Sequence, residues 1–172
     1  MKFLLRYTFI LSLFLSCTNK IHKEIKNTKI VLNALTDFQL KQTINTVPFY
    51  KDKRRNALAI NAVKFKNKFA LAYSTFMGND GVYQINLTTL KETDGESTYS
   101  ILLNHKVLKE FKNDETTNDF EPQVFNIKNI PLKKNDIIEV KFNTHSNGKI
   151  PENGDFAFSR GRWRSIEFIL VN

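Results

Sequence analysis

The sequence is poor in the residues that cross-link or stiffen a small fold. It has a single cysteine among 172 residues, so no internal disulfide can form. It has six glycines, four prolines, one tryptophan and two methionines, against fifteen phenylalanines. Apolar packing must therefore hold the fold together, and a chain of this length can bury a sizeable core without cross-links. The sequence predicts one domain of ordinary size preceded by a leader.

The leader lacks an apolar run long enough to cross a bilayer. After a basic start, residues 7–15 are almost wholly apolar, about half of the ~20 residues that a spanning helix needs. Such a run is typical of a secretion signal. It ends at Ser16-Cys17, which resembles the bacterial lipoprotein signal, whose cysteine becomes the lipidated first residue of the mature chain. We expect a signal peptide over residues 1–17, a lipid anchor at Cys17 and a place in the cell envelope. Ordinary secretion and an uncleaved anchor are the alternatives.

Neither glycine nor proline occurs in residues 18–46, which are rich in lysine, asparagine and threonine. We expect a polar tether over this range and a folded domain over residues 47–172. A short helix is the alternative, because the apolar residues Ile21, Ile25 and Leu32 recur near helical spacing.

Beyond the tether, about eight short stretches read as strands between turn signals, and several of them alternate apolar and polar side chains, which is typical of antiparallel strands. They cover residues 58–63, 69–76, 82–88, 99–103, 107–111, 124–130, 138–142 and 165–171. Asn104-His105 predicts a two-residue hairpin turn, because asparagine tolerates a left-handed backbone. No helical pattern and no internal repeat is present there. The sequence therefore predicts an all-β sandwich.

Four features give this pattern a family resemblance: Gly81-Val82-Tyr83-Gln84-Ile85, an acidic loop, the Leu102-Leu103-Asn104 hairpin and the closing Ile166-Glu167-Phe168 strand. Their order resembles the jelly-roll carbohydrate-binding modules, with families six, thirty-five and thirty-six nearest in pattern. His105 is a departure, because those families usually have glycine after the hairpin asparagine. The resemblance implies a jelly-roll β-sandwich that binds polysaccharide or another glycan without cleaving it, often with calcium.

The first candidate ligand site surrounds the one tryptophan. Alternation projected backwards from Ile166 places Arg162 and Arg164 at the mouth of the sandwich and Trp163 on the opposite face. An exposed tryptophan can stack on a sugar ring, and an arginine fork binds carboxylate or sulfate. The alternative is a buried Trp163 with solvated arginines, and a bulge at Gly161 would reverse the parity. The candidate ligand-binding residues are Trp163, Arg160, Arg162, Arg164, Asn143, His145 and Asn147, the last three because amide and imidazole groups bond sugar hydroxyls.

Carboxylates in two loops form a candidate calcium site. Asp94 and Glu96 share one loop, and Glu152 and Asp155 share another. Calcium takes six to eight oxygen ligands, which such loops can supply, although turn carboxylates need no metal. A catalytic site would need His145 with Glu152 or Asp155, and we expect no enzyme.

The net charge of +9 favours an acidic partner. Export argues against nucleic acid. The basic run at Lys51, Lys53, Arg54 and Arg55 is either a solvated face or an anion-binding patch. We expect a non-catalytic glycan-binding module of a membrane-anchored envelope lipoprotein that favours anionic polysaccharide. The alternatives are a structural or adaptor lipoprotein that binds another envelope protein, and a small glycan-cleaving enzyme or lyase.

Overall fold

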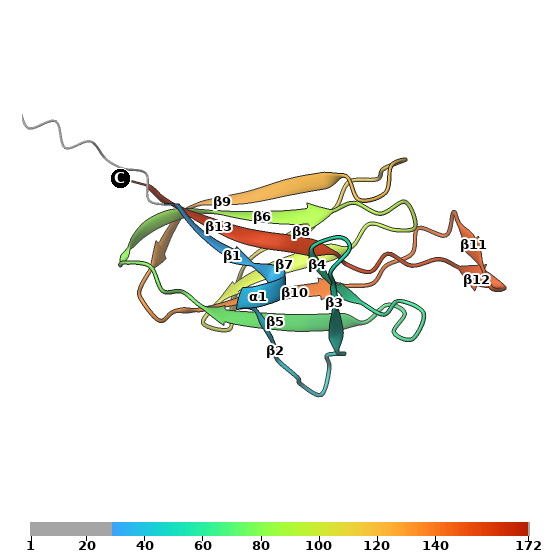
Figure 1. Cartoon of the computed structure of the whole chain (residues 1–172), viewed down its shortest axis with the longest axis horizontal. Coiled ribbons are helices and arrows are strands. Elements are labelled where there is room, and N and C mark those ends of the chain that lie inside the picture. The colour runs from blue at the N-terminus through green and yellow to red at the C-terminus, as the bar shows by residue number, and fades with distance from the viewer. Residues whose placement is uncertain (1–28, 172) are drawn as a thin grey trace, which may run out of the picture.

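The computed structural model describes residues 29–171, which form a sandwich of two antiparallel β-sheets (Figure 1). The predicted all-β sandwich is confirmed. The predicted signal peptide and Cys17 lie outside the described residues. Between residues 29 and 171, no helix has the length and apolar character needed to cross a membrane.

The first sheet has the strand order β3-β4-β13-β6-β9, and β1 also pairs with β13. Its strands are β1 (Lys29–Asn33), β3 (Phe49–Asp52), β4 (Ala57–Ile60), β6 (Gly81–Leu90), β9 (Pro122–Leu132) and β13 (Trp163–Val171). The second sheet has the order β2-β5-β10-β7-β8. Its strands are β2 (Gln39–Leu40), β5 (Phe69–Thr75), β7 (Thr98–Leu103), β8 (Lys106–Lys112) and β10 (Ile137–Asn143).

Two small elements complete the fold. The helix α1 (Ala34–Asp37) follows β1, and the hairpin of β11 (Pro151–Glu152) and β12 (Asp155–Phe156) projects from the end of the sandwich opposite the C-terminus (Figure 1). The eight predicted strands correspond to β4 to β10 and β13. The strands β1, β2, β3, β11 and β12 were not predicted.

The core lies between the sheets because each strand alternates inward and outward side chains. In β10, Ile138, Val140 and Phe142 are buried, as predicted. In β5, the small residues Ala70 and Ala72 are buried, while their neighbours along the strand are partly exposed. Apolar side chains from both sheets fill the inward positions of the strands. A surface site on either sheet can therefore be formed only by side chains at the outward positions.

The turn between β7 and β8 has the predicted geometry. Asn104 and His105 have φ angles of 48° and 70°, so both residues are left-handed, as a two-residue hairpin turn requires. The turn places the His105 side chain beside the outer face of the second sheet, where it lines a pocket.

The predicted tether over residues 18–46, and with it the domain start at residue 47, is wrong for residues 29–46. Ile30 and Leu32 of β1 lie opposite Phe168 and Ile166 of β13 and pack against the core. Phe38 is buried after α1. Ile30, Leu32 and Phe38 of this segment therefore belong to the sandwich, and the lysine, asparagine and threonine residues around them obscured the apolar pattern.

Candidate functional site

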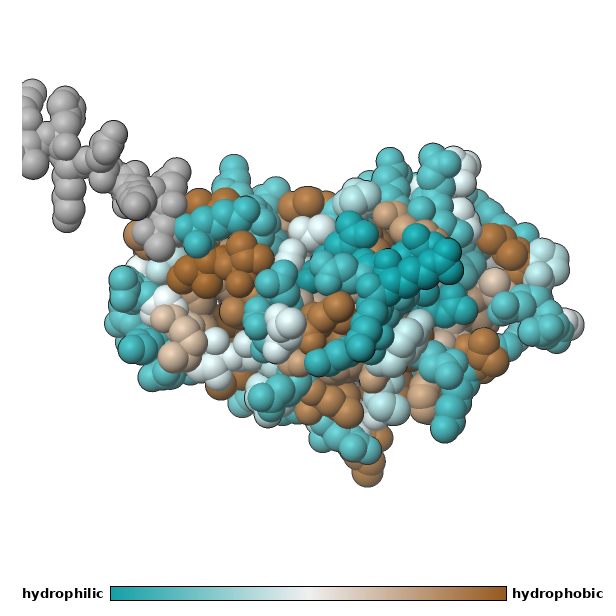
Figure 2. All heavy atoms as spheres, in the orientation of Figure 1, coloured by the Kyte–Doolittle hydropathy of each residue, from teal (hydrophilic) through white to brown (hydrophobic). Residues whose placement is uncertain are grey.

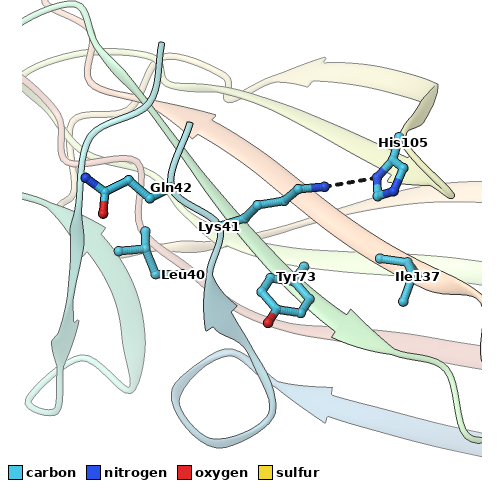
Figure 3. A pocket seen from close by; sticks show the side chains of 6 residues that line it. All are labelled: Leu40, Lys41, Gln42, Tyr73, His105 and Ile137. Carbon is cyan, nitrogen blue, oxygen red and sulfur yellow. Dashed lines mark hydrogen bonds between the residues drawn. The ribbon is translucent and has the colours of Figure 1, made fainter. Parts of the chain in front are cut away.

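A pocket of about 370 Å³ opens on the outer face of the second sheet. It is lined by Leu40, Lys41, Gln42, Tyr73, His105 and Ile137 (Figure 3). The segment at and after β2 supplies one wall, the β7–β8 turn supplies another, and β5 and β10 lie between them. Figure 3 shows the Lys41 side chain extended towards the His105 ring across this space.

Strand alternation brings Tyr73 to the pocket. Its neighbours Ala72 and Ser74 are buried, so the Tyr73 ring faces outward from β5. The register of β5 and β10 places Glu139 directly opposite Tyr73. The Tyr73 hydroxyl donates a hydrogen bond to Gln39 Oε1 at 2.9 Å, which fixes the orientation of the ring.

A buried carboxylate lies beside the pocket. Glu139 is 1% exposed and contacts the side chains of Lys41 and His105. Lys41 Nζ donates to Glu139 Oε1 at 2.6 Å, and His105 Nδ1 lies 2.8 Å from Glu139 Oε2. Burial by itself raises the pKa of Glu139, but the hydrogen bonds and positive charges of Lys41 and His105 outweigh burial, so its pKa lies below the ordinary value. Glu139 is therefore ionised at neutral pH and holds both pocket side chains in place.

The pocket combines an apolar surface with polar groups around it. The Tyr73 ring, Leu40 and Ile137 offer apolar contact, while Lys41 and His105 bring nitrogen atoms to the rim. Small-molecule sites commonly have this composition, and a tyrosine ring can pack against the C–H face of a sugar.

The structure places the predicted ligand residue Arg162 in the interior. Arg162 is 5% exposed, its Nε donates to Asp52 Oδ2 at 2.8 Å, and its NH1 group donates to Glu92 Oε1. The Arg160 backbone N–H donates to Glu92 Oε2 at 2.9 Å. Burial raises the pKa of Glu92 to about 7, although Arg162 favours the charged form. The predicted position of Arg162 at an open mouth is therefore wrong, because two carboxylates bind it inside the protein.

Trp163 is fully buried, so the predicted exposed stacking surface is also wrong. Its ring meets Phe38 edge-on with centroids 4.8 Å apart, and it lies 6.0 Å from the ring of Phe142. The Nε1 atom has no hydrogen-bond partner among the described residues. Trp163 is a core residue that joins the segment after α1 to both sheets.

A β-bulge explains the error in parity. Trp163 and Ser165 pair with consecutive residues of β6, so Arg164 is one extra residue in β13. The extra residue turns Trp163 to the same side as the core residue Ile166. The parity is thus reversed, although the register shift lies at Arg164 rather than at Gly161.

Of the predicted polar loop residues, Asn143 and Asn147 form hydrogen bonds within the protein, whereas His145 Nδ1 has no hydrogen-bond partner among the described residues. Asn143 Oδ1 accepts a backbone N–H of β7 at 2.7 Å. The Asn147 amide donates to Glu96 Oε1 at 3.2 Å, and His145 Nδ1 lies 3.8 Å from Glu96 Oε2. Glu96 is thus the carboxylate beside His145, whereas the predicted catalytic arrangement used Glu152 or Asp155. A ligand-binding role for these residues stays a prediction.

The predicted calcium ligands do not form one site. Glu152 and Asp155 belong to the β11–β12 hairpin, where Asp155 pairs with Lys66 at 2.5 Å. Asp94 Oδ1 is a buried acceptor without a hydrogen-bond partner in the described part of the chain, and Glu96 lies in the same loop. Among residues 29–171, no three His, Cys, Asp or Glu side chains gather to hold a metal. The predicted set therefore does not fit the six to eight oxygen ligands of calcium.

The pocket was not predicted from the sequence. Tyr73 carried a signal, because a large aromatic residue occupied an outward position of a predicted strand. His105 carried another, because it stood where the resembling families have glycine. Residues 40–42 carried none, because the predicted tether included them.

No protein-family model matches the chain. A stretch of 156 residues is 31% identical to uncharacterized protein P23 of Formosa agariphila and covers 89% of this chain. The same match covers 34% of P23, so the chain spans about a third of the length of that relative.

Solved structures share the fold at low sequence identity. A CBM36 domain of a multidomain xylanase from the hindgut metagenome of Trinervitermes trinervoides is 9% identical, with a TM-score of 0.54 over 84% of this chain and 99% of that domain. A CBM36 module in complex with calcium and xylotriose is 13% identical, with a TM-score of 0.51 over 81% of this chain and 98% of that module. The predicted jelly-roll fold of the carbohydrate-binding modules is therefore confirmed.

Proposed function

We propose that the sandwich is a non-catalytic glycan-binding module and that its ligand binds in the pocket on the outer face of the second sheet. The observation that carries the proposal is the oriented Tyr73 ring between the polar side chains of Lys41, Gln42 and His105. The jelly-roll fold supports it, because a CBM36 module of the same fold has been solved in complex with xylotriose.

The pocket suits a sugar ring for physical reasons. The C–H face of a pyranose packs against the Tyr73 ring, and its hydroxyl groups hydrogen-bond to the ammonium, amide and imidazole groups around the rim. Glu139 holds Lys41 and His105 before the ligand arrives. Fewer side chains then lose freedom on binding, which lowers the entropic cost of association.

The charges at the pocket support binding without cleavage. Glycoside hydrolysis generally uses two carboxyl groups, of which one must be protonated to act as the acid. In the described part of the chain, the pocket lining contains no carboxyl group. The carboxylate beside it, Glu139, is buried and has a lowered pKa, so it does not serve as that acid.

The proposal extends to the placement of the module and to the charge of its ligand. The chain is exported and anchored in the bacterial envelope through a lipid on Cys17, as the leader pattern supports. Its ligand is an anionic polysaccharide, which the net charge of +9 supports.

Tyr73→Ala tests the proposal. A glycan array screened with the full chain identifies a ligand, and titration then compares the variant with the wild type. We expect an affinity loss of at least about tenfold, or roughly 1.4 kcal/mol. The melting temperature should change little, because the ring is partly exposed.

Phe156→Ala is the matched control, because it removes an aromatic ring that is 43% exposed on β12, outside the pocket. It should bind the glycan like the wild type. Unchanged binding by Tyr73→Ala would exclude the pocket as the binding site, and cleavage of the bound glycan would contradict the non-catalytic role.

A further inference from the structure

The β3–β4 hairpin and the start of β13 carry a dense group of cations. We call Lys51, Lys53, Arg54, Arg55 and Arg164 the hairpin surface. Lys51, Lys53 and Arg54 are exposed, and the two other arginines are partly exposed. Figure 2 shows strongly hydrophilic side chains gathered over this hairpin.

The cations of the hairpin surface lack carboxylate partners. Within residues 29–171, no ion pair joins any of the five to an aspartate or glutamate. Asp52 lies in the same hairpin, but its Oδ2 atom accepts a hydrogen bond from the buried Arg162. Glu92 binds Arg162 as well. Both carboxylates therefore direct their side-chain ion pairs to the buried Arg162, and neither forms an ion pair with the hairpin surface.

Two of these arginines are held in position. The Arg55 guanidinium carbon lies 3.7 Å from the centroid of the Phe120 ring, as in a cation–π contact. The Arg164 Nε donates to the backbone oxygen of Arg55 at 3.0 Å. A guanidinium that is already oriented loses less freedom when its remaining N–H groups bind a planar or tetrahedral oxyanion.

We infer that the hairpin surface is a second subsite, which binds the sulfate or carboxylate groups of an anionic polysaccharide. The inference rests on the proposed glycan binding and assigns its charge preference to named residues. Lysine ammonium groups attract the polymer, and the fixed guanidinium groups of Arg55 and Arg164 contact its oxyanions directly. Such a subsite selects charged polymers over neutral ones with the same sugar backbone.

Three polymers with one backbone test this selection: dextran sulfate, carboxymethyl dextran and uncharged dextran. The full chain is compared with Arg54→Ala/Arg55→Ala. The matched control is Lys133→Ala/Lys134→Ala, which removes the same charge from the β9–β10 turn. That turn follows Leu132, which pairs with Gly81 beside the Val171 end of β13, whereas the hairpin surface adjoins the Trp163 end.

We expect Arg54→Ala/Arg55→Ala to bind both charged dextrans about fivefold to twentyfold more weakly than the wild type, as for two exposed ion pairs. The difference should shrink as salt screens the charges. The lysine control should change affinity less than about twofold. If the melting temperature of the arginine variant falls, Lys51→Ala/Lys53→Ala repeats the test with two exposed side chains.

Tyr73→Ala with the glycan found on the array reports on the pocket, whereas Arg54→Ala/Arg55→Ala with the charged dextrans reports on the hairpin surface, so a failure of one can be told from a failure of the other. Equal losses in the arginine variant and in the lysine control would overturn the inference, because they would show an effect of net charge alone. Tighter binding of duplex DNA than of dextran sulfate would also overturn it, in favour of nucleic acid as the partner.

Discussion

Arg162→Met measures how strongly the buried ion pairs hold the end of the sandwich. Arg162 joins Asp52 of β3 to Glu92 in the segment after β6. Methionine fills much of the same volume without charge, so Glu92 remains buried at 3% exposure with no cation beside its Oε1 atom. Removing one partner of a buried ion pair typically costs about 3–5 kcal/mol. We expect a loss of this size in the free energy of unfolding at pH 8.

The cost should depend on pH, because burial raises the pKa of Glu92 from 4.5 to about 7. The folded protein then binds the proton more tightly than the unfolded chain. The contribution of Glu92 to stability is therefore complete below pH 4.5, and about 3 kcal/mol of it is lost as the pH rises through 7. Without the Arg162 charge the pKa of Glu92 rises further, so the deficit of the variant grows between pH 5 and pH 8.

Urea unfolding at pH 5 and pH 8 measures the free energy of unfolding of the wild type and the variant, and thermal unfolding measures their melting temperatures. At pH 8 the melting temperature of Arg162→Met should fall by about 10 °C or more. Arg54→Met is the control, since it removes an exposed arginine of the same region and should change the free energy of unfolding by less than about 0.5 kcal/mol. A deficit below about 1 kcal/mol at pH 8, or the same deficit at both pH values, would refute the argument. Glu92→Gln added to Arg162→Met should restore part of the lost stability, because a neutral amide replaces the unpaired charge.

Two further predictions concern the N-terminal part of the chain. Cys17→Ser should move the protein from the membrane fraction to the soluble fraction and abolish incorporation of a labelled fatty acid; unchanged membrane retention would count against lipidation. A chain that starts at Val47 should unfold at a much lower temperature than the wild type, because it lacks β1 and Phe38, and loss of one buried phenylalanine side chain alone typically costs about 3–5 kcal/mol. A wild-type melting temperature for that shortened chain would show that β1 adds nothing to the sandwich.

Most of the strands that the sequence predicts show their apolar–polar alternation within the strand itself. In β6, the residues Tyr83, Ile85 and Leu87 are buried and their neighbours are not, so the pattern is visible without knowledge of the partner strand. The Asn104-His105 turn is local in the same way. The strands β2 and β3 have two and four residues, too few to show a period, and their partners become known only in the folded protein.

The candidate sites depend on contacts between residues far apart in the sequence. Arg162 bonds to Asp52 and Glu92, which are 110 and 70 residues away in the sequence, and no local sequence pattern predicts either pair. Alternation alone assumes that the strand has no irregularity, whereas the bulge at Arg164 shifts the register of β13 by one residue. The pocket likewise joins Lys41 to His105 across 64 residues. The sequence could therefore name Arg162 as a candidate but not its partners, and it did not indicate the pocket.

The course of β1 relates the proposed lipid anchor to the proposed binding surfaces. Lys29 lies opposite Ile169, near the C-terminal end of β13, whereas β4 of the β3–β4 hairpin meets the other end of β13 at Trp163. The chain thus enters the sandwich at the end opposite the hairpin surface. Eleven residues separate Cys17 from Lys29. They span at most about 40 Å when fully extended, whereas a tether that ran to residue 46, as predicted, would span about 100 Å. With the proposed lipid anchor at Cys17, the end of the sandwich at which the chain enters is held close to the membrane. The hairpin surface then lies at the other end of β13 from the anchored segment, where a long anionic polymer can reach it.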